Sequence, residues 1–321
     1  MSGQPIFNRL ALIGVGLIGS SIAHAARKQG AARSIVATAR SAATRRRVAE
    51  LGLADQVVET NAAAAEGADL VIVCVPVGAC GEVAAEIGPH LAPGATVSDV
   101  GSVKGAVLRD MAPHIPAGVH FVPAHPVAGT ENSGPDSGFA ELFVNRWCIL
   151  TPPPQTEAAA VARLAAFWSL LGANVETMAA EHHDLVLGIT SHLPHLIAYT
   201  IVGTAEELSQ VTRSEVLQFS AGGFRDFTRI AASDPTMWRD VFLANKDAVL
   251  EMLGRFSEDL STLTRAIRRG DGDTLFDHFT RTRAIRRGIV EIGQDSPAPD
   301  FGRPHPDLPH APLPRPYAAD D

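Results

Sequence analysis

The stretch Gly14-Val15-Gly16-Leu17-Ile18-Gly19 lies directly between the apolar run Leu10–Ile13 and an alanine-rich segment with helical spacing. This order of strand, turn and helix is typical of the first unit of a dinucleotide-binding fold. Outward from it, short β-rich runs alternate with helical stretches, which indicates parallel βαβ units. The runs are Leu10–Ile13, Ser34–Thr38, Leu70–Val75, Thr96–Val100, His120–Val122 and Trp147–Leu150. They predict an α/β N-terminal Rossmann domain with a doubly wound, mostly parallel sheet.

The glycines of this turn differ in the role expected of each. Gly14 permits the tight turn, Gly16 lets a pyrophosphate approach the backbone, and Gly19 allows the helix to pack closely on the strand. The helix then opens at Leu17 and Ile18, where backbone N–H groups and the helix dipole favour phosphate. The sequence therefore predicts NAD(P) binding, and the alternative is a glycine turn without a ligand.

The residues after the second predicted strand bear on the choice of cofactor. NAD-binding folds usually carry an acid there for the ribose hydroxyls, whereas this chain has Arg40, Ser41 and Thr44. A guanidinium pairs with a 2′-phosphate, which an acid would repel. We therefore expect NADP to be favoured over NAD, unless Arg40 is simply a surface residue. Val75 and Pro76 end the third predicted strand where the cofactor should pass, although packing explains them equally well.

Composition and charge limit the classes of protein to consider. The 321 residues have a net charge of −8, with 46% hydrophobic and 19% charged residues, which is ordinary for a folded chain and unsuited to nucleic acid. Cys74, Cys80 and Cys148 cannot all pair, which favours a reducing cytoplasm. There is no signal pattern, and no apolar run reaches the roughly 18 residues of a membrane span. We expect a cytoplasmic protein without a nucleic-acid or membrane partner.

The segment Thr151-Pro152-Pro153-Pro154 interrupts every regular pattern and marks the predicted domain boundary. The Rossmann domain is expected to cover residues 1–152, with a last βα unit that extends to about 180. Residues 153–294 are predicted to form an all-α domain for substrate binding and dimerisation. The Pro-rich segment 295–321 has little to bury and is expected to be a disordered tail.

One long helix is expected near the C-terminus, because apolar residues recur there at alternating steps of four and three. These residues are Val249, Leu253, Phe256, Leu260, Leu263 and Ile267. The apolar seam needs a partner, which is either another helix of the same chain or the same helix of a second copy. A homodimer is one of these two solutions.

Two further strand ends carry polar side chains suited to catalysis. Ser102 follows the strand Thr96–Val100, and His125 follows His120–Val122, with Pro126 holding it in an extended conformation. Ligands of open α/β sheets bind outside such strand ends. His125 is placed to take a proton from an alcohol during hydride transfer, and Ser102 to bind the same hydroxyl. The alternative for His125 is a buried packing or capping role.

The helical half offers groups for a carboxylate substrate. In Ser191-His192-Leu193-Pro194-His195, the proline is expected to bend a helix beside two histidines. Arg229 is a candidate anchor for a carboxylate, and Asp226 either orients it or pairs with it at the surface.

Ser233-Asp234-Pro235 is a helix start, with Trp238 in the first turn of that helix. Potential metal ligands also occur in the helical half, but they form no compact triplet, so no metal is expected. They are His182, His183, Asp184, His192 and His195.

Five segments can be compared as a set. They are Gly14-Val15-Gly16-Leu17-Ile18-Gly19-Ser20-Ser21, Asp99-Val100-Gly101-Ser102-Val103-Lys104, His125-Pro126-Val127-Ala128-Gly129-Thr130-Glu131, Ser191-His192-Leu193-Pro194-His195 and Phe224-Arg225-Asp226-Phe227-Thr228-Arg229-Ile230-Ala231. In sequence, order and spacing they resemble the prephenate/arogenate dehydrogenase family, over about residues 8–293. The last four are far more specific than the glycine turn.

The resemblance implies oxidative decarboxylation in tyrosine biosynthesis, from prephenate to 4-hydroxyphenylpyruvate or from arogenate to tyrosine, with hydride passing to NAD(P). It implies that His125 accepts the proton of the ring hydroxyl, that Ser102 bonds this hydroxyl, and that His195 and Arg229 bind substrate. The residues expected to line or support the pocket are Thr130, Glu131, Asp226 and Trp238. Members of the family are typically dimers through their helical domains, and the chain resembles the NADP-using members at Arg40.

Two rival hypotheses stay open at this point. One is another Rossmann oxidoreductase with a helical domain, acting on a β-hydroxy acid or an imine, which does not explain His125 together with Arg229. The other is a catalytically silent NADP-binding regulator, which keeps the glycine turn and has no need for His125.

Overall fold

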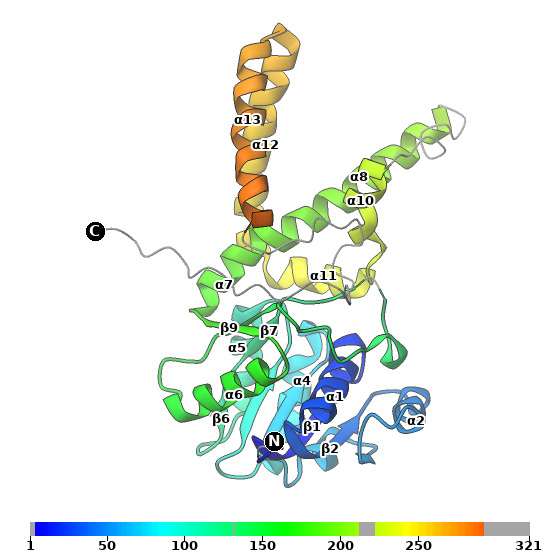
Figure 1. Ribbon diagram of the computed structural model, residues 1–321, viewed down its shortest axis with the longest axis vertical. Helices are drawn as coiled ribbons and strands as arrows, with labels where there is room; N and C mark the ends of the chain where they lie inside the picture. Colours follow the sequence, from blue (N-terminus) through cyan, green and yellow to red (C-terminus); the bar gives the residue numbers. More distant parts are fainter. Residues whose placement is uncertain (1–3, 131, 212–221, 292–321) are drawn as a thin grey trace. The chain divides into compact units, whose positions relative to one another are not determined.

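The computed structural model describes residues 4–130, 132–211 and 222–291. The chain divides into two compact units, Met1–Met252 and Leu253–Asp321. Among the described residues, the first unit holds the strands and the helices up to the start of α12, and the second holds the rest of α12 and α13 (Figure 1). The predicted tail, 295–321, lies outside the described residues.

A six-stranded parallel sheet forms the centre of the first unit, in the order β3-β2-β1-β4-β5-β6. Its strands are β1 (Phe7–Ile13), β2 (Ala32–Thr38), β3 (Gln56–Val57), β4 (Leu70–Val73), β5 (Thr96–Asp99) and β6 (His120–Phe121). The order reverses between β1 and β4, and in sheets of this type ligands bind at the carboxyl ends of the strands on either side of such a reversal. The predicted doubly wound sheet is confirmed. The sequence did not show β3, because only two of its residues pair.

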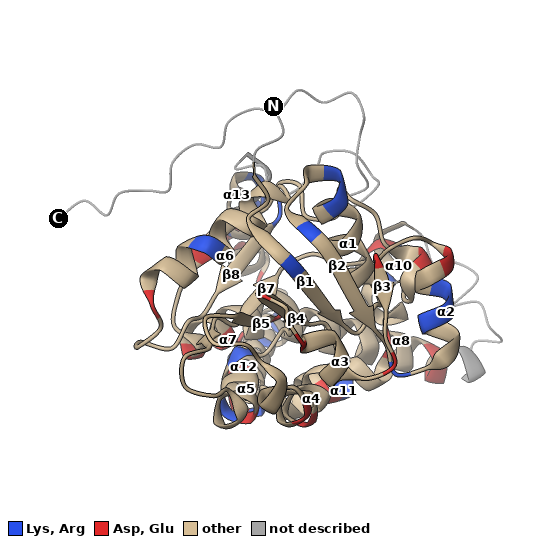
Figure 2. Cartoon of the chain, turned by 90° about the horizontal axis from the view of Figure 1, so that it is seen from below, with Lys and Arg blue, Asp and Glu red and all other residues tan. Residues whose placement is uncertain are grey.

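Strand β1 explains why the predicted strands are continuous apolar runs. Leu10 and Leu12 belong to one core cluster, and Ala11 and Ile13 belong to another, so both faces of the sheet are covered. The helices of this region are α1 (Leu17–Gln29), α2 (Ala42–Glu50), α3 (Asn61–Ala65), α4 (Cys80–Ile87), α5 (Lys104–Met111) and α6 (Ala158–Leu170). Figure 2 shows α1 and α6 on one side of the sheet and α3, α4 and α5 on the other, with most charged residues on the helices.

A second, three-stranded sheet follows, in the order β7-β8-β9. Its strands are β7 (Ala124–Pro126), β8 (Trp147–Leu150) and β9 (Asn174–Thr177). The run Trp147–Leu150 was expected in the main sheet, but β8 pairs antiparallel with β7 and parallel with β9. Pro123 separates β6 from β7 and cannot donate to a ladder, so the chain leaves the main sheet there. This departure gives His125 a strand of its own.

The helical segment of the first unit begins after β9. Its elements are α7 (Ala180–Leu187), the π-helical turn η5 (Gly188–His192), α8 (Leu193–Val211), α10 (Gly222–Thr228), the short helix η6 (Arg229–Ala232) and α11 (Pro235–Ala244). Pro194 lies at the start of α8, directly after the π-helical turn, where its missing N–H is tolerated. Asp234 caps α11 by accepting from Met237 N, as its sequence predicts. Trp238 and Val241 of α11 pack into the core cluster of the main sheet.

The continuous segment Ala180–Leu208 has 29 residues and is long and apolar enough to cross a membrane. The expectation that no apolar run has this length is therefore wrong. The segment nevertheless carries His183, Asp184 and His192, which are buried within the first unit and hydrogen-bonded there. We interpret it as a helix of the folded domain.

The predicted long helix is α12 (Lys246–Arg269), which is followed by α13 (Gly272–Glu291). The seam residues are unequally covered, because Val249 is buried while Leu260 and Ile267 are exposed by 52% and 66%. In α13, Phe276, Phe279 and Ile285 are also exposed. Packing within the described chain therefore leaves a large part of the apolar surface of these helices uncovered.

Candidate active site

The glycine turn forms a cradle packed so tightly that two of its three glycines have no space for a Cβ atom. Gly14 has a φ of +90°, and a Cβ there would lie 2.6 Å from the carbonyl oxygen of Cys74. A Cβ on Gly19 would clash with the carbonyl of Gly14, whereas a Cβ on Gly16 would meet no atom within 4 Å. Packing therefore requires glycine at Gly14 and Gly19, and the backbone at Gly16 stays open to a ligand. A dinucleotide fits such a cradle.

Helix α1 starts in this cradle. Its first residues, Leu17 and Ile18, follow Gly16 without a side-chain cap, and no acidic residue lies in the first turn. The uncapped N–H groups and the helix dipole favour a phosphate at this end. The loop after β7 packs beside it, since Phe139 N donates to Ser21 Oγ at 3.2 Å.

The loop after β2 keeps the residues that indicated NADP at the surface. Arg40 is exposed, and Ser41 caps α2 by accepting from Thr44 N at 3.0 Å. The two hydroxyls of Ser41 and Thr44 lie 2.7 Å apart. Arg45 Nη1 donates to the carbonyls of Ala39 and Arg40 and adds a second guanidinium to the loop. The loop thus carries positive charge and no acid.

Strand β4 ends at Val73, two residues before the predicted end at Val75. Cys74 N still donates to Ile13 O at 2.7 Å, but Pro76 has no N–H with which to continue the ladder. A Cβ on Gly14 would lie 3.0 Å from Val75 Cγ1, so Val75 lies against the glycine turn. Pro76 is exposed after it.

His125 of β7 is the end of a chain of hydrogen bonds. His125 is 8% exposed, and its Nδ1 lies 2.8 Å from Nε2 of His183. Nδ1 of His183 lies in turn 2.8 Å from Oδ1 of Asp184. A carboxylate accepts, so His183 donates from Nδ1 and its Nε2 accepts from His125 Nδ1. His125 Nε2 is then the unprotonated nitrogen, which is what a general base requires.

Burial keeps this pair of imidazoles neutral. Burial lowers the pKa of His125 well below its ordinary 6.5, and the neighbouring His183 and Lys104 lower it further. The pKa of His183 is also lowered, mainly by burial, although the bond with Asp184 opposes this. His125 is therefore neutral at physiological pH and able to accept a proton.

Asp184 connects the histidine chain to α5. Its Oδ1 accepts from Lys104 N at 2.7 Å, and its Oδ2 accepts from Gly105 N at 2.8 Å. These are N–H groups at the start of α5, which has no cap from a side chain of its own N-cap residue. One carboxylate from the helical segment thus caps a helix of the Rossmann region and orients His183.

An ion pair with no solvent exposure lies beneath His125. Lys104 Nζ donates to Asp99 Oδ2 at 2.5 Å and to Ala124 O at 2.7 Å. Asp99 also accepts from Gly101 N at 2.7 Å and from Ala124 N at 3.2 Å. The pair therefore joins the end of β5, the start of α5 and β7 at Ala124, the residue before His125.

Ser102 lies in the turn between the two partners of this ion pair. It is half-buried, and its hydroxyl makes no hydrogen bond with the residues that the structure describes. Hydrogen bonds fix both ends of the turn, because Gly101 N donates to the Asp99 carboxylate and Lys104 N donates to the Asp184 carboxylate. The Ser102 hydroxyl is thus available to a ligand on a fixed backbone.

His195 and Trp238 form the second group of the site. Their rings stack at 3.7 Å with an interplanar angle of 24°. His195 Nδ1 donates to Ser191 O at 2.8 Å, which leaves Nε2 as an acceptor. The pKa of His195 is lowered mainly by burial and also by the positive charge of Arg229, which therefore acts on this ring. Tyr199 OH donates to Ser233 O at 2.7 Å and holds α8 to the end of η6.

His192 lies between the two groups. It lowers the pKa of His125, and its ring meets Trp238 edge-on at 6.1 Å. The predicted residues His125, His195, Trp238 and Arg229 are therefore linked through neighbouring side chains of one compact unit.

Other predicted residues are not brought into this group. Thr130 is exposed and accepts from Asn132 N at 3.2 Å, and Asp226 is exposed on α10. Neither makes a hydrogen bond with the His125 or His195 rings in the described part of the chain. Glu131 lies outside the described residues.

Sequence reasoning missed the supporting residues. His183 and Asp184 were considered only as metal ligands, and His192 was considered as a metal ligand and as one of the two histidines beside the proline bend. No cluster of metal-binding type occurs in residues 4–130, 132–211 and 222–291. Asp99 and Lys104 stood in a quoted segment without a role. A buried lysine can be suspected where an Asp ends an apolar strand five residues earlier, but its partner at Ala124 is distant in sequence.

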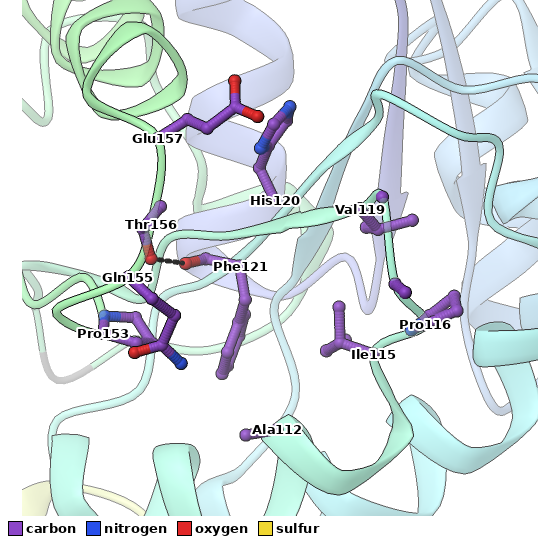
Figure 3. Close-up of a pocket in the computed structure, with 12 residues that line it drawn as sticks. Ala112, Ile115, Pro116, Val119, His120, Phe121, Pro153, Gln155, Thr156 and Glu157 are labelled. Atoms are coloured by element: carbon purple, nitrogen blue, oxygen red, sulfur yellow. Dashed lines mark hydrogen bonds between the residues drawn. The ribbon is translucent and has the colours of Figure 1, made fainter.

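A hollow of about 340 Å³ lies elsewhere, at the edge strand β6 (Figure 3). Ile115, Val119, His120 and Glu157 are among its lining residues, and Thr156 Oγ1 donates to Phe121 O there at 3.3 Å. None of the predicted site residues lines it.

Comparison with known proteins gives consistent matches. The family model described as prephenate dehydrogenase, nucleotide-binding domain, matches residues 22–177, and that described as prephenate dehydrogenase, dimerization domain, matches residues 179–281. The chain is 43% identical over 284 residues to cyclohexadienyl dehydrogenase of Zymomonas mobilis, covering 88% of this chain and 97% of the relative. It is 32% identical over 304 residues to prephenate dehydrogenase of Bacillus subtilis, covering 94% and 81%.

Solved structures agree with these matches. Prephenate dehydrogenase from Aquifex aeolicus, in complex with hydroxyphenyl propionate and NAD+, aligns with a TM-score of 0.82 and 33% identity, over 88% of this chain and 98% of that one. Arogenate dehydrogenase of Synechocystis aligns with a TM-score of 0.74 and 26% identity, over 88% and 99%.

Proposed function

The chain belongs to the prephenate dehydrogenase family, and from that premise we propose that it oxidises and decarboxylates prephenate, arogenate or both. It is an NAD(P)-dependent oxidoreductase, and its place is in tyrosine biosynthesis. The main support for His125 as the general base is the hydrogen-bond chain from Asp184 through His183 to His125. This chain leaves Nε2 of His125 as an acceptor.

Gly14, Gly16 and Gly19 would hold a nicotinamide dinucleotide, which would supply the acceptor for the hydride of the ring carbon that carries the hydroxyl. His125 Nε2 accepts the proton of that hydroxyl, while the Ser102 hydroxyl bonds the same oxygen. His125 Nδ1 continues to donate to His183 as the imidazole becomes charged, and Asp184 stabilises this charge. The ketone so formed lets the ring carboxylate leave as carbon dioxide, and its electrons make the ring aromatic. His125 then returns the proton to the ring oxygen.

Arg229 and His195 are assigned to bind the substrate beside the His125 group. The charge of Arg229 pairs with a substrate carboxylate, and His195 accepts a hydrogen bond at Nε2. Trp238 holds His195 by stacking, because it is itself packed into the core of the sheet. Thr130, Glu131 and Asp226 remain predicted pocket residues.

The cofactor is proposed to be NADP in preference to NAD. The support is the exposed Arg40 beside Ser41 and Thr44, the second guanidinium of Arg45, and the absence of an acid from residues 38–44. The remaining cofactor contacts are assigned to Gly14, Gly16, Leu17, Ile18, Gly19, Val75 and Pro76.

A homodimer in the cytoplasm is proposed as the state of the enzyme. The exposed apolar residues of α12 and α13 support it, since a second copy would cover Leu260, Ile267, Phe276 and Phe279. The matched region at residues 179–281 is of the type described as a dimerization domain. Cys74, Cys80 and Cys148 are free thiols, as a reducing compartment requires.

The direct test measures formation of reduced cofactor by the purified chain with prephenate and with arogenate, each with NADP+ and with NAD+. Turnover of at least one substrate, faster with NADP+ at equal low concentration, is expected. A folded protein that binds NADP+ but oxidises neither substrate would reject the proposed function and favour a regulator. Faster turnover with NAD+ would reject only the cofactor preference.

A further inference from the structure

His192 is a buried histidine that the proposed mechanism does not use. It has no solvent exposure and lies in the π-helical turn η5, between the His125 and His195 groups. π-Helical turns cost stability and occur often at functional sites. A side chain that served only to fill this space could be apolar, without the cost of burying two ring nitrogens.

The contacts of Asn245 fix the tautomer of His192. Asn245 Nδ2 donates to the carbonyl oxygen of Asp184 at 2.8 Å, so this atom is the amide nitrogen and not the amide oxygen. The same Nδ2 lies 3.0 Å from Nδ1 of His192. An amide nitrogen only donates, so Nδ1 of His192 accepts, and the ring proton of a neutral His192 lies on Nε2.

His192 is neutral at physiological pH. Its pKa is lowered to about 4, mainly by burial and to a smaller extent by His183 and His195, while Asp184 and the backbone of Ser102 act in the opposite direction. These groups come from α7, α8 and the turn after β5, and the ring is also contacted by Trp238 of α11 and by Asn245 at the end of α11. The ring can therefore donate a hydrogen bond from Nε2 as a neutral imidazole, without carrying a full positive charge.

The Nε2–H group of His192 is a buried donor without an acceptor among the described residues. Nε2 of His192 is fully buried and has no partner within hydrogen-bond distance among the described residues. Among the groups that act on the pKa of His192, the backbone of Ser102 is the one that does so as a hydrogen-bonding partner of the ring. Hydrogen bonds of this kind are often long in an enzyme without substrate and shorten in the reacting complex.

We propose that His192 is a positioning residue, which uses its Nε2–H, set by Asn245, to hold the backbone of Ser102. This inference rests on the proposed function, since Ser102 is assigned there to the substrate hydroxyl. Gly101 and Lys104 fix the ends of the turn, and His192 supports its middle. The Ser102 hydroxyl and His125 Nε2 are then directed at the same substrate oxygen. Asn245 has a double role, because it also holds the backbone of Asp184.

Two variants separate positioning from packing. His192→Gln keeps an N–H donor near the position of Nε2, and His192→Leu removes it while filling the space. We expect His192→Leu to lower kcat by about tenfold or more, with KM for substrate and cofactor changed by less than about twofold. His192→Gln should recover kcat to within about threefold of the wild type. Unchanged kcat in the Leu variant, or equal loss in both variants, would overturn the proposal.

A second measurement needs no activity. Nitrogen NMR of the full-length protein with labelled histidine should show one ring with Nε2 protonated and Nδ1 bare from about pH 6 to pH 8. The resonance is assigned to His192 by its loss in His192→Gln. A proton on Nδ1, or a charged ring in this range, would overturn the proposal even if the Leu variant did not fold. Failure of the wild type to oxidise prephenate or arogenate would instead reject the proposed function.

Discussion

Lys104 and Arg40 both follow strands of the same parallel sheet, yet Lys104 has no solvent exposure and Arg40 is exposed. Lys104 donates to Asp99 and to the backbone of Ala124, and it holds β7 beneath His125. Arg40 follows β2 in a loop whose hydrogen bonds are local, between Ser41 and Thr44 and from Arg45.

The two regions respond differently to the loss of a side chain. Around Lys104 each polar group has several partners, so removing one leaves a buried charge and displaces the strand that carries the proposed base, His125. Around Arg40 water replaces whatever is removed, so we expect a change there to leave the fold intact and, under the proposed cofactor preference, to alter the affinity for NADP alone. We therefore expect the geometry of the proposed site to depend on the buried region and the proposed cofactor preference to depend on the exposed one.

The largest expected effect is on stability, and it compares a buried with an exposed lysine. Lys104→Met leaves the buried Asp99 carboxylate unpaired and should lower the free energy of unfolding by about 3–5 kcal/mol. Lys28→Met removes the exposed pair with Glu141 and should cost less than about 1 kcal/mol. Urea denaturation measures both. A loss at Lys104 as small as that at Lys28 would show that the buried pair does not hold the site.

Acid should weaken the buried region first. The pKa values of His125, His183, His192 and His195 are all lowered in the folded protein, so the unfolded chain binds more protons as pH falls below 6.5. Stability is therefore lost from about pH 6.5 downward. His192 alone, at about 4, accounts for roughly 2 kcal/mol by pH 5. Urea midpoints at several pH values should fall in the wild type and fall less in His192→Gln; parallel curves would contradict this.

Substrate binding should depend on Arg229 and not on its exposed neighbour. Arg229→Ala removes a charged partner of a carboxylate and should raise KM for substrate by about thirtyfold, with a smaller change in kcat. Arg225→Ala, at an exposed position of α10, serves as the control and should change KM by less than about twofold. Steady-state kinetics with saturating cofactor measure both variants. Equal values for both would remove Arg229 from the substrate site.

The smallest expected effect is at the exposed loop. Arg40→Ala should lower kcat/KM for NADP+ by about tenfold and leave kcat/KM for NAD+ unchanged within about twofold. Arg33→Ala, at the exposed start of β2, is the matched control and should change neither. An equal loss for both cofactors in Arg40→Ala would show that the residue does not read the 2′-phosphate.

The sequence was informative where a single local pattern decides the structure. Strands buried on both faces appear as apolar runs, and the glycine turn follows one of them, so β1, β2 and β5 were predicted within a few residues. His125 and Ser102 were predicted as site residues because ligands bind at the strand ends of such sheets, and this assignment stays a prediction. The helix start at Asp234 was predicted for the same local reason.

The network beneath His125 could not be found in this way. Asp184 caps a helix that begins 80 residues earlier, and His125 meets His183 at a separation of 58 residues. Local sequence patterns do not reveal contacts between residues so far apart in the chain. A His-Asp sequence is also equally compatible with metal binding. β7 was missed because three residues are too few to show a period.

The role of His125 is tested most directly by His125→Asn, which keeps a polar side chain but removes the base. With saturating substrate and NADP+, we predict that kcat for cofactor reduction falls by at least about a hundredfold while KM for substrate changes by less than about threefold. A folded His125→Asn enzyme with the turnover of the wild type would contradict the assignment of His125 as the base that the buried network supports.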